Sequence, residues 1–173
     1  RSLVGGSIRN NVYKIAANYG TSIFSGQTVE AVAAGGIEAA AAGDTQQLGV
    51  FGGVQYTDPT SGKPTFKPFY SASTNASDLE AIVYDDPQLI FEVQHDGTGT
   101  AAMNFSAFDF TGVAGSTISG QSTQELDTST SGTGGGFKQL SIVTDPSNDD
   151  TSSANANAFV AFNTGEHVFK LTT

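Results

Sequence analysis

Few side chains in this 173-residue chain could perform acid-base or nucleophilic chemistry. The sequence has two histidines, His95 and His167, and no cysteine. A catalytic triad needs a histidine beside a serine and an aspartate, and with 18 Ser and 11 Asp such proximity arises easily by chance. A hydrolase or metal-dependent enzyme would have to combine these histidines with Asp85 and Asp86. We expect both histidines instead to pack at the surface or at strand edges.

Two acidic segments offer carboxylate oxygens, the ligands that Ca2+ prefers. One is Asp85-Asp86-Pro87, and the other contains Asp145, Asp149 and Asp150. Neither has the spacing of an EF-hand loop. Asp-Asp-Pro at a strand end more often forms a turn, in which Asp accepts hydrogen bonds from backbone N–H groups. We therefore expect turns at these positions, with no metal ion and no cofactor.

The composition is typical of an all-β protein and excludes several chemistries. The chain has 18 Ser, 20 Thr and 21 Gly, and charged residues are 14% of it, against about 25% in average soluble domains. Without cysteine there are no disulfides and no Cys-based zinc sites. The run Gly132-Thr133-Gly134-Gly135-Gly136 lacks the Lys-Ser/Thr pair of a phosphate-binding loop.

The net charge argues against two classes of partner. A formal charge of -10 and a pI of about 4.3 disfavour binding to nucleic acid and to anionic membranes. No stretch approaches the roughly 20 apolar residues that span a bilayer, and we expect no signal peptide.

The charges are distributed unevenly along the chain. Residues 1–70 carry a net +1, residues 71–137 carry -9 and no base, and residues 138–173 carry -2. The first 14 residues hold three of the seven bases and no acid. The sequence therefore predicts an extended N-terminal arm, residues 1–12, on a single β-rich body, residues 13–173. The arm is either a frayed terminus or a tether that docks on an acidic neighbour.

Short runs with β character recur between Gly, Asn, Asp and Pro. Roughly ten such strands, long polar loops at 128–136 and 145–157, and little helix predict a small β-barrel or sandwich. Pro64 and Pro68 should confine their run to a sheet edge. Residues 101–110 fit a short helix or a bulged strand. The predicted strands are 12–16, 21–24, 28–33, 37–39, 46–51, 54–56, 64–69, 81–84, 89–93, 137–144, 158–162 and 167–171.

Aromatic side chains gather on the Pro-bounded run. The chain has 12 Phe, five Tyr and no Trp, and Phe66, Phe69 and Tyr70 lie close together in sequence. They either fill a small core or form an apolar patch for a neighbouring subunit. Both faces of this run carry apolar side chains, which is what a strand covered by another subunit would show.

Several Gly-rich and turn-rich motifs follow one another along the chain. They are Gly5-Gly6-Ser7-Ile8-Arg9-Asn10-Asn11-x-Tyr13-x-Ile15-Ala16, Tyr19-Gly20-Thr21-Ser22-Ile23-Phe24-Ser25-Gly26, Leu48-Gly49-Val50-Phe51-Gly52-Gly53-Val54-x-Tyr56, Tyr84-Asp85-Asp86-Pro87 and Phe91-Glu92-Val93-Gln94. In this order they resemble small structural proteins of tailed-phage virions. The resemblance covers most of residues 5–125, and part of it, Gly26–Val54, is similar to the small β-barrel of trimeric head-decoration proteins.

The resemblance implies a capsid decoration, or cement, protein with no enzymatic activity and no cofactor. Such a protein would be assembled in the host cytoplasm. It would bind the capsid exterior as a homotrimer and stabilise the head by bridging neighbouring major capsid protein subunits. The alternatives are a phage tail or fibre-associated β-module that recognises a host surface glycan, an enzyme, and a non-viral adhesin or surface-layer domain. The predicted partner-binding residues are Arg1, Leu3, Val4, Ile8, Arg9, Phe66, Phe69 and Tyr70.

Overall fold

The computed structural model describes residues 8–112, 115–132, 134–148 and 153–170. Within them the chain is all-β, as the sequence predicts, with twelve strands and three single-turn 3-10 helices. The strands form antiparallel sheets in a sandwich-like arrangement, and the strand orders found there do not close into a barrel. No helix among these residues is long and apolar enough to span a membrane.

The larger sheet has the order β1-β8-β5-β3-β4, with β6 paired to β5. A bridge between Lys14 and Gly36 links β1 to the β3–β4 turn, so this sheet curves around its core. A two-stranded sheet, β2 (Ile23–Phe24) with β7 (Phe69–Tyr70), accompanies it. The strands of the larger sheet are β1 (Asn11–Lys14), β3 (Thr28–Ala31), β4 (Ile37–Ala39), β5 (Gln47–Thr57), β6 (Pro64–Lys67) and β8 (Glu80–Tyr84).

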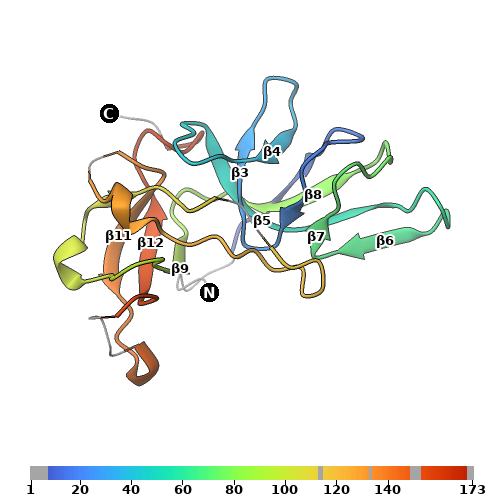
Figure 1. Ribbon diagram of the computed structural model, residues 1–173. Helices are drawn as coiled ribbons and strands as arrows, with labels where there is room; N and C mark the ends of the chain where they lie inside the picture. Colours follow the sequence, from blue (N-terminus) through green and yellow to red (C-terminus); the bar gives the residue numbers. More distant parts are fainter. Residues whose placement is uncertain (1–7, 113–114, 133, 149–152, 171–173) are drawn as a thin grey trace.

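The second sheet has the order β10-β11-β12-β9. Bridges from His95 and Phe110 to Leu126 connect its two outer strands through one intervening segment. Figure 1 shows this sheet beside the larger one, at the end of the molecule away from β6. Its strands are β9 (Ile90–Gln94), β10 (Ala107–Phe108), β11 (Phe137–Ile142) and β12 (Asn157–Phe162).

Each sheet encloses its own apolar cluster, because alternate residues of a strand point to the same face. In β8 the second and fourth residues are buried, and in β12 every second residue is buried. The first cluster includes Ile23, Val29 and Phe51, and the second includes Phe108 and Phe162. Full burial of one such side chain contributes about 1.5–3 kcal/mol.

Strand β5 corrects one prediction. The sequence suggests a break at Gly52 and Gly53, but β5 runs through both and pairs with β8 on either side of a bulge at Gly52. Gly53 has φ 145°, and a Cβ there would lie 2.6 Å from the Phe66 ring. The two glycines therefore admit the bulge and the ring without interrupting the strand.

Three other differences have local causes. The run 64–69 lies at the sheet edge as predicted, but Pro68 divides it into β6 and β7. Residues 101–110 combine both expectations, a 3-10 helix (Ala101–Met103) and then β10. The predicted strand at 167–171 is wrong over its described part, because His167–Lys170 forms a turn with a Lys170 N–H to His167 C=O hydrogen bond.

We predict that Gly49→Ala lowers the free energy of unfolding by about 1–3 kcal/mol. A Cβ at Gly49 would overlap the backbone carbonyl oxygen of Tyr84 and lie 2.8 Å from a Val83 methyl group, so β5 and β8 would have to separate. Urea unfolding measures the change. Gly20→Ala is the matched control, since nothing lies within 4 Å of that position, and its change should stay within about 0.5 kcal/mol. Equal stability of the two variants would contradict the β5–β8 pairing.

Candidate functional site

A fully buried carboxylate, Asp85, lies just beyond the end of β8. It accepts hydrogen bonds from Arg9 Nε at 3.1 Å and Nη2 at 3.3 Å. Asn11 Nδ2 donates at 2.7 Å and the Tyr13 hydroxyl at 2.6 Å. One charge is thus neutralised by an ion pair and satisfied by four donors, the arrangement that burial of a carboxylate requires.

The strand period explains why three residues reach the same carboxylate. Arg9, Asn11 and Tyr13 are spaced by two, so they share one face of an extended segment. Antiparallel pairing of Asn11 with Val83 and of Tyr13 with Ala81 then sets this segment along β8. We name the edge of β8 together with Asp85 the arm slot.

The predicted arm is in part a strand of the larger sheet. Asn11 belongs to β1, so the sheet begins inside the segment 1–12 that the sequence assigns to the arm. Arg9 meets a carboxylate as expected, but of its own chain, and its guanidinium carbon also lies 5.5 Å from the Phe169 ring centroid. Ile8 is 43% exposed. Arg1, Leu3 and Val4 lie outside the described residues.

The charges of the arm slot are fixed at neutral pH. Burial acts to raise the pKa of Asp85, but the hydrogen bonds from Arg9, Tyr13 and Asn11 outweigh it, and the net pKa lies below its usual value. Burial first, and then the hydrogen bond to Asp85, raise the pKa of Tyr13 to about 12. Asp85 is therefore an ionised acceptor and Tyr13 a protonated donor.

Neither histidine lies at the surface. His95 directly follows β9, and His167 is bridged to Gln47 of β5, so both pack beside strands, which is one of the two expected positions. His95 is fully buried, with Nε2 2.9 Å from Gln139 Oε1 and its ring edge-on to Phe108. His167 is 3% exposed, its Nδ1 accepts the Phe169 N–H at 3.1 Å, and its ring lies against Phe162. Burial lowers the pKa of both imidazoles, so they fill the core in the neutral form.

The acidic segments form turns. Asp86 Oδ1 accepts the Gln88 N–H at 2.9 Å, and Asp145 Oδ1 accepts the Ser147 N–H at 2.9 Å, as the sequence predicts. Asp149 and Asp150 lie outside the described residues. In the part of the chain that the structure describes, no group of three or more His, Asp or Glu side chains is placed to hold a metal ion.

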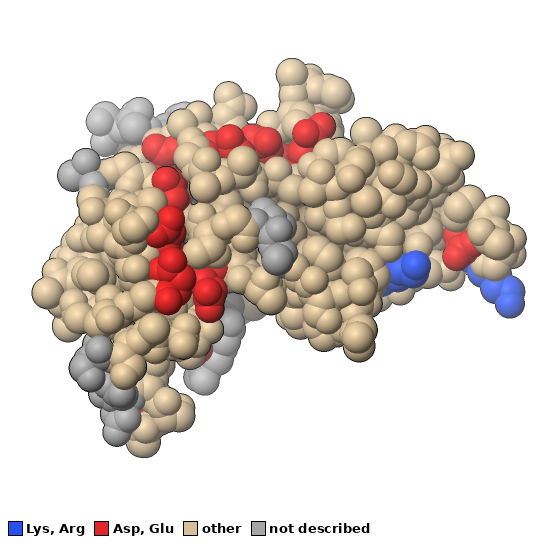
Figure 2. Space-filling view, in the orientation of Figure 1, with Lys and Arg blue, Asp and Glu red and all other residues tan. Residues whose placement is uncertain are grey.

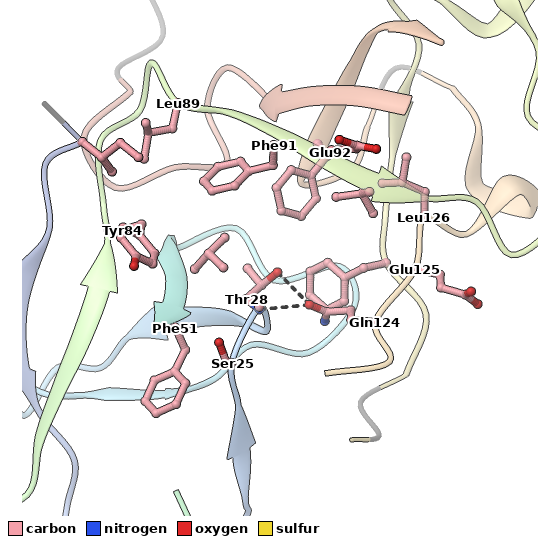
Figure 3. A pocket seen from close by; sticks show the side chains of 16 residues that line it. Ser25, Thr28, Phe51, Tyr84, Leu89, Phe91, Glu92, Gln124, Glu125 and Leu126 are labelled. Atoms are coloured by element: carbon pink, nitrogen blue, oxygen red, sulfur yellow. Dashed lines mark hydrogen bonds between the residues drawn. The ribbon is translucent and has the colours of Figure 1, made fainter. Parts of the chain in front are cut away.

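A cavity of about 330 Å³ separates the two sheets. Figure 3 shows Phe51 and Tyr84 on one side and Leu89 and Phe91 on the other. At one end Gln124 accepts hydrogen bonds from the Thr28 N–H at 2.9 Å and the Thr28 hydroxyl at 3.0 Å. The lining is mainly apolar, so the cavity suits an apolar group. Sequence reasoning missed it because its walls come from segments far apart in the chain.

The predicted aromatic patch is only partly exposed. Phe66 is 59% exposed. Phe69 is half-buried and stacks on Phe24 with centroids 5.7 Å apart. Tyr70 follows the first of the two alternatives, core filling, and not the partner patch: it is 1% exposed, and its hydroxyl donates to the Tyr19 carbonyl oxygen at 2.9 Å. Other exposed apolar residues, which the sequence did not single out, are Val12, Phe105, Ile118, Val168 and Phe169.

An apolar strip crosses the outer face of the larger sheet. Directly paired residues present their side chains on the same face. Val12 pairs with Ile82 and Ile82 with Gly53, over which the Phe66 ring lies. Val12 is 51% exposed and Ile82 is partly exposed. We name Val12, Ile82 and Phe66 the outer strip.

Acidic side chains gather on one side of the molecule. In Figure 2 they form a band over the half that carries the four-stranded sheet and continue across the top of the view toward the β3–β4 turn, whereas most Lys and Arg in view lie at the end that carries β6. In the larger sheet Glu30 and Glu38 sit directly opposite each other, an unfavourable pairing of like charges. Burial, Asp44 and Glu38, in that order, raise the pKa of Glu30.

We predict that Tyr13→Phe lowers the free energy of unfolding at neutral pH by about 1.5–3 kcal/mol, the usual contribution of a hydrogen bond to a charged group. The pKa of Asp85 is depressed by folding, so its stabilisation is present above about pH 3.9 and is lost as the pH falls through the folded value. Without the Tyr13 hydroxyl this loss should begin at higher pH. Acid titration followed by circular dichroism measures both effects.

The control for this substitution is Tyr84→Phe. The Tyr84 hydroxyl has no hydrogen-bond partner among the described residues, so its removal should leave the acid transition unchanged. An identical acid transition for Tyr13→Phe and Tyr84→Phe would show that Tyr13 does not hold the Asp85 charge.

We predict that stability falls as the pH drops from about 6.5 toward 5. Folding lowers the pKa of His95 and His167, so the unfolded chain binds more protons in this range. Each histidine contributes a slope of up to about 1.4 kcal/mol per pH unit. The double variant His95→Gln, His167→Gln should flatten the curve of unfolding midpoint against pH. An unchanged slope would mean that neither imidazole is neutral in the folded chain.

Comparison with known proteins adds no relative to this description. Models of protein families, curated proteins and solved structures give no match to the chain.

Proposed function

We propose that this chain is a structural protein of a tailed-phage virion that decorates the outside of the head and stabilises it by bridging major capsid protein subunits. The outer strip carries this proposal, because it is an exposed apolar surface on a sheet face. The motifs in residues 5–125 that resemble virion structural proteins support the same function.

The outer strip has the properties of a contact surface. Phe66 is 59% exposed, yet its ring is held in place because it lies across Gly53. A fixed aromatic side chain loses little conformational entropy on binding. Aromatic side chains with apolar neighbours such as Ile82 and Val12 are the usual centres of protein interfaces.

The interior of the chain supports a binding role over an enzymatic one. His95 and His167, which an enzyme would need, are buried against Phe108 and Phe162. The Asp85 carboxylate is occupied by Arg9, Asn11 and Tyr13. The cavity between the sheets is lined mainly by apolar residues. The histidines and Asp85 maintain the fold, which leaves the exposed outer strip as the surface for a protein partner.

A homotrimer on the capsid exterior is the form we propose for the assembled protein. Three copies related by a closed symmetry axis would present three outer strips at once. Simultaneous contacts raise the effective concentration at each site, so weak single contacts suffice. The acidic band in Figure 2 suits a position outside the head, because it would repel packaged DNA.

We predict that the purified chain sediments with empty phage shells and that Phe66→Ser weakens this binding about 10-fold or more. The substitution removes the aromatic contact without creating a buried cavity. Phe105→Ser is the matched control, since Phe105 is 72% exposed but follows the 3-10 helix Ala101–Met103, away from the outer strip. Co-sedimentation at increasing protein concentration measures both affinities.

The outcomes separate the candidate functions. Hundreds of copies per particle support decoration, whereas a dozen or fewer, with a hit on a glycan array, support a tail or fibre module. Equal binding by Phe66→Ser and Phe105→Ser would remove the outer strip from the contact. A chain that never co-sediments with shells would overturn the proposal.

A further inference from the structure

Strand β1 is an edge strand of the larger sheet. It pairs with β8 alone, apart from one bridge between Lys14 and Gly36. Three of its four residues are exposed, and Tyr13 is half-buried. Ile15, just after the strand, is the one fully buried apolar side chain of this segment. Separation of β1 from β8 would therefore uncover Ile15 and the buried part of Tyr13, which contact the first apolar cluster, and little other apolar surface of this segment.

The attachment is nevertheless specific. Arg9, Asn11 and Tyr13 all bind one carboxylate that lies 72–76 positions further along the chain. A strand shifted by one residue would turn all three donors away from Asp85. The arm slot thus recognises an extended segment with Arg, Asn and Tyr at alternate positions.

An empty arm slot would be an unstable surface. It would expose the backbone edge of β8, and unpaired strand edges recruit other strands. It would also leave the buried charge of Asp85 without its ion pair and donors, which is strongly destabilising. The segment of this chain that satisfies both the edge and the charge is β1 itself, from this copy or from another.

We propose that the arm slot of one copy binds β1 of a second copy, so that neighbouring copies exchange this strand. Every contact in the exchanged form equals one in the single chain, and the balance is set by the effective concentration of the second copy. In the exchanged form the chain would change direction only at residues 16–18, which include Asn18 with φ 60°. Ile15 precedes this turn and would move with the strand. The proposal does not depend on capsid decoration.

Two single-cysteine variants of the full chain test the exchange. The protein has no cysteine, so Val12→Cys and Ile82→Cys each introduce one thiol. These positions are directly paired between β1 and β8, and paired residues of antiparallel strands lie within the Cα distance that a disulfide requires. The variants carry tags of different mass, are refolded together at high concentration, oxidised, and separated on a non-reducing gel.

We expect a disulfide-linked heterodimer of Val12→Cys with Ile82→Cys, at least about 10-fold more abundant than in the control mixture. The control pairs Val12→Cys with Gln55→Cys, because Gln55 is on the same sheet face but on β5, beyond β8. The same chain carrying both Val12→Cys and Ile82→Cys reports whether the register is correct within one copy.

Asp85→Asn distinguishes the copy that supplies the slot from the copy that supplies the strand. Placed in the Ile82→Cys chain, which supplies the slot, it should reduce the heterodimer several-fold, whereas in the Val12→Cys chain, which supplies the strand, it should not. If the doubly substituted chain closes its internal disulfide but the mixed variants give no more heterodimer than the control, the exchange does not occur. The assay contains no shells, so its failure leaves the proposed function untouched.

Discussion

The buried charge of Asp85 is the constraint on which the arrangement of the N-terminal segment depends. A carboxylate without solvent access must be neutralised and hydrogen-bonded, and the groups that do so come from Arg9, Asn11 and Tyr13. Since those residues alternate, the segment must be extended and must lie along β8 in one register. One side chain at the end of β8 thus fixes the register of β1 against the body. The same carboxylate brings Arg9 over Phe169, near the other end of the described chain.

The rest of the larger sheet depends on glycines at which a neighbouring strand or an aromatic ring lies close to the backbone. Gly49 lies where β8 passes, and Gly53 lies beneath the Phe66 ring. The long strand β5 can therefore pair with β8 on one side and with β3 and β6 on the other. The exposed ring that we assign to partner binding is a product of the same packing. In this chain Gly53 gives the outer strip its shape, while the apolar clusters supply most of the stability.

The all-β class, the edge position of residues 64–67 and the Asp86 turn were predictable from sequence, because Pro, Asp and alternating apolar residues act locally. The continuity of β5 was not, since Gly52 and Gly53 read as a break unless the partner strand is known. The hydrogen bond that holds the buried Tyr70 and the role of Asp85 were also missed. Each depends on a residue more than 50 positions away, Tyr19 and Arg9 respectively, and local pattern carries no such information. The spacing of Arg9, Asn11 and Tyr13 was the available signal for the slot, though it does not name the acceptor.

The pocket between the two sheets leaves apolar surface of both sheets uncovered. Its walls, among them Phe51 in β5 and Leu89 and Phe91 at β9, are mainly apolar, and it is partly open to solvent. A small apolar molecule that filled this space of about 330 Å³ would contact both sheets at once. Because it would bind the folded chain and not the unfolded one, it would raise the free energy of unfolding by an amount that grows with the logarithm of its concentration.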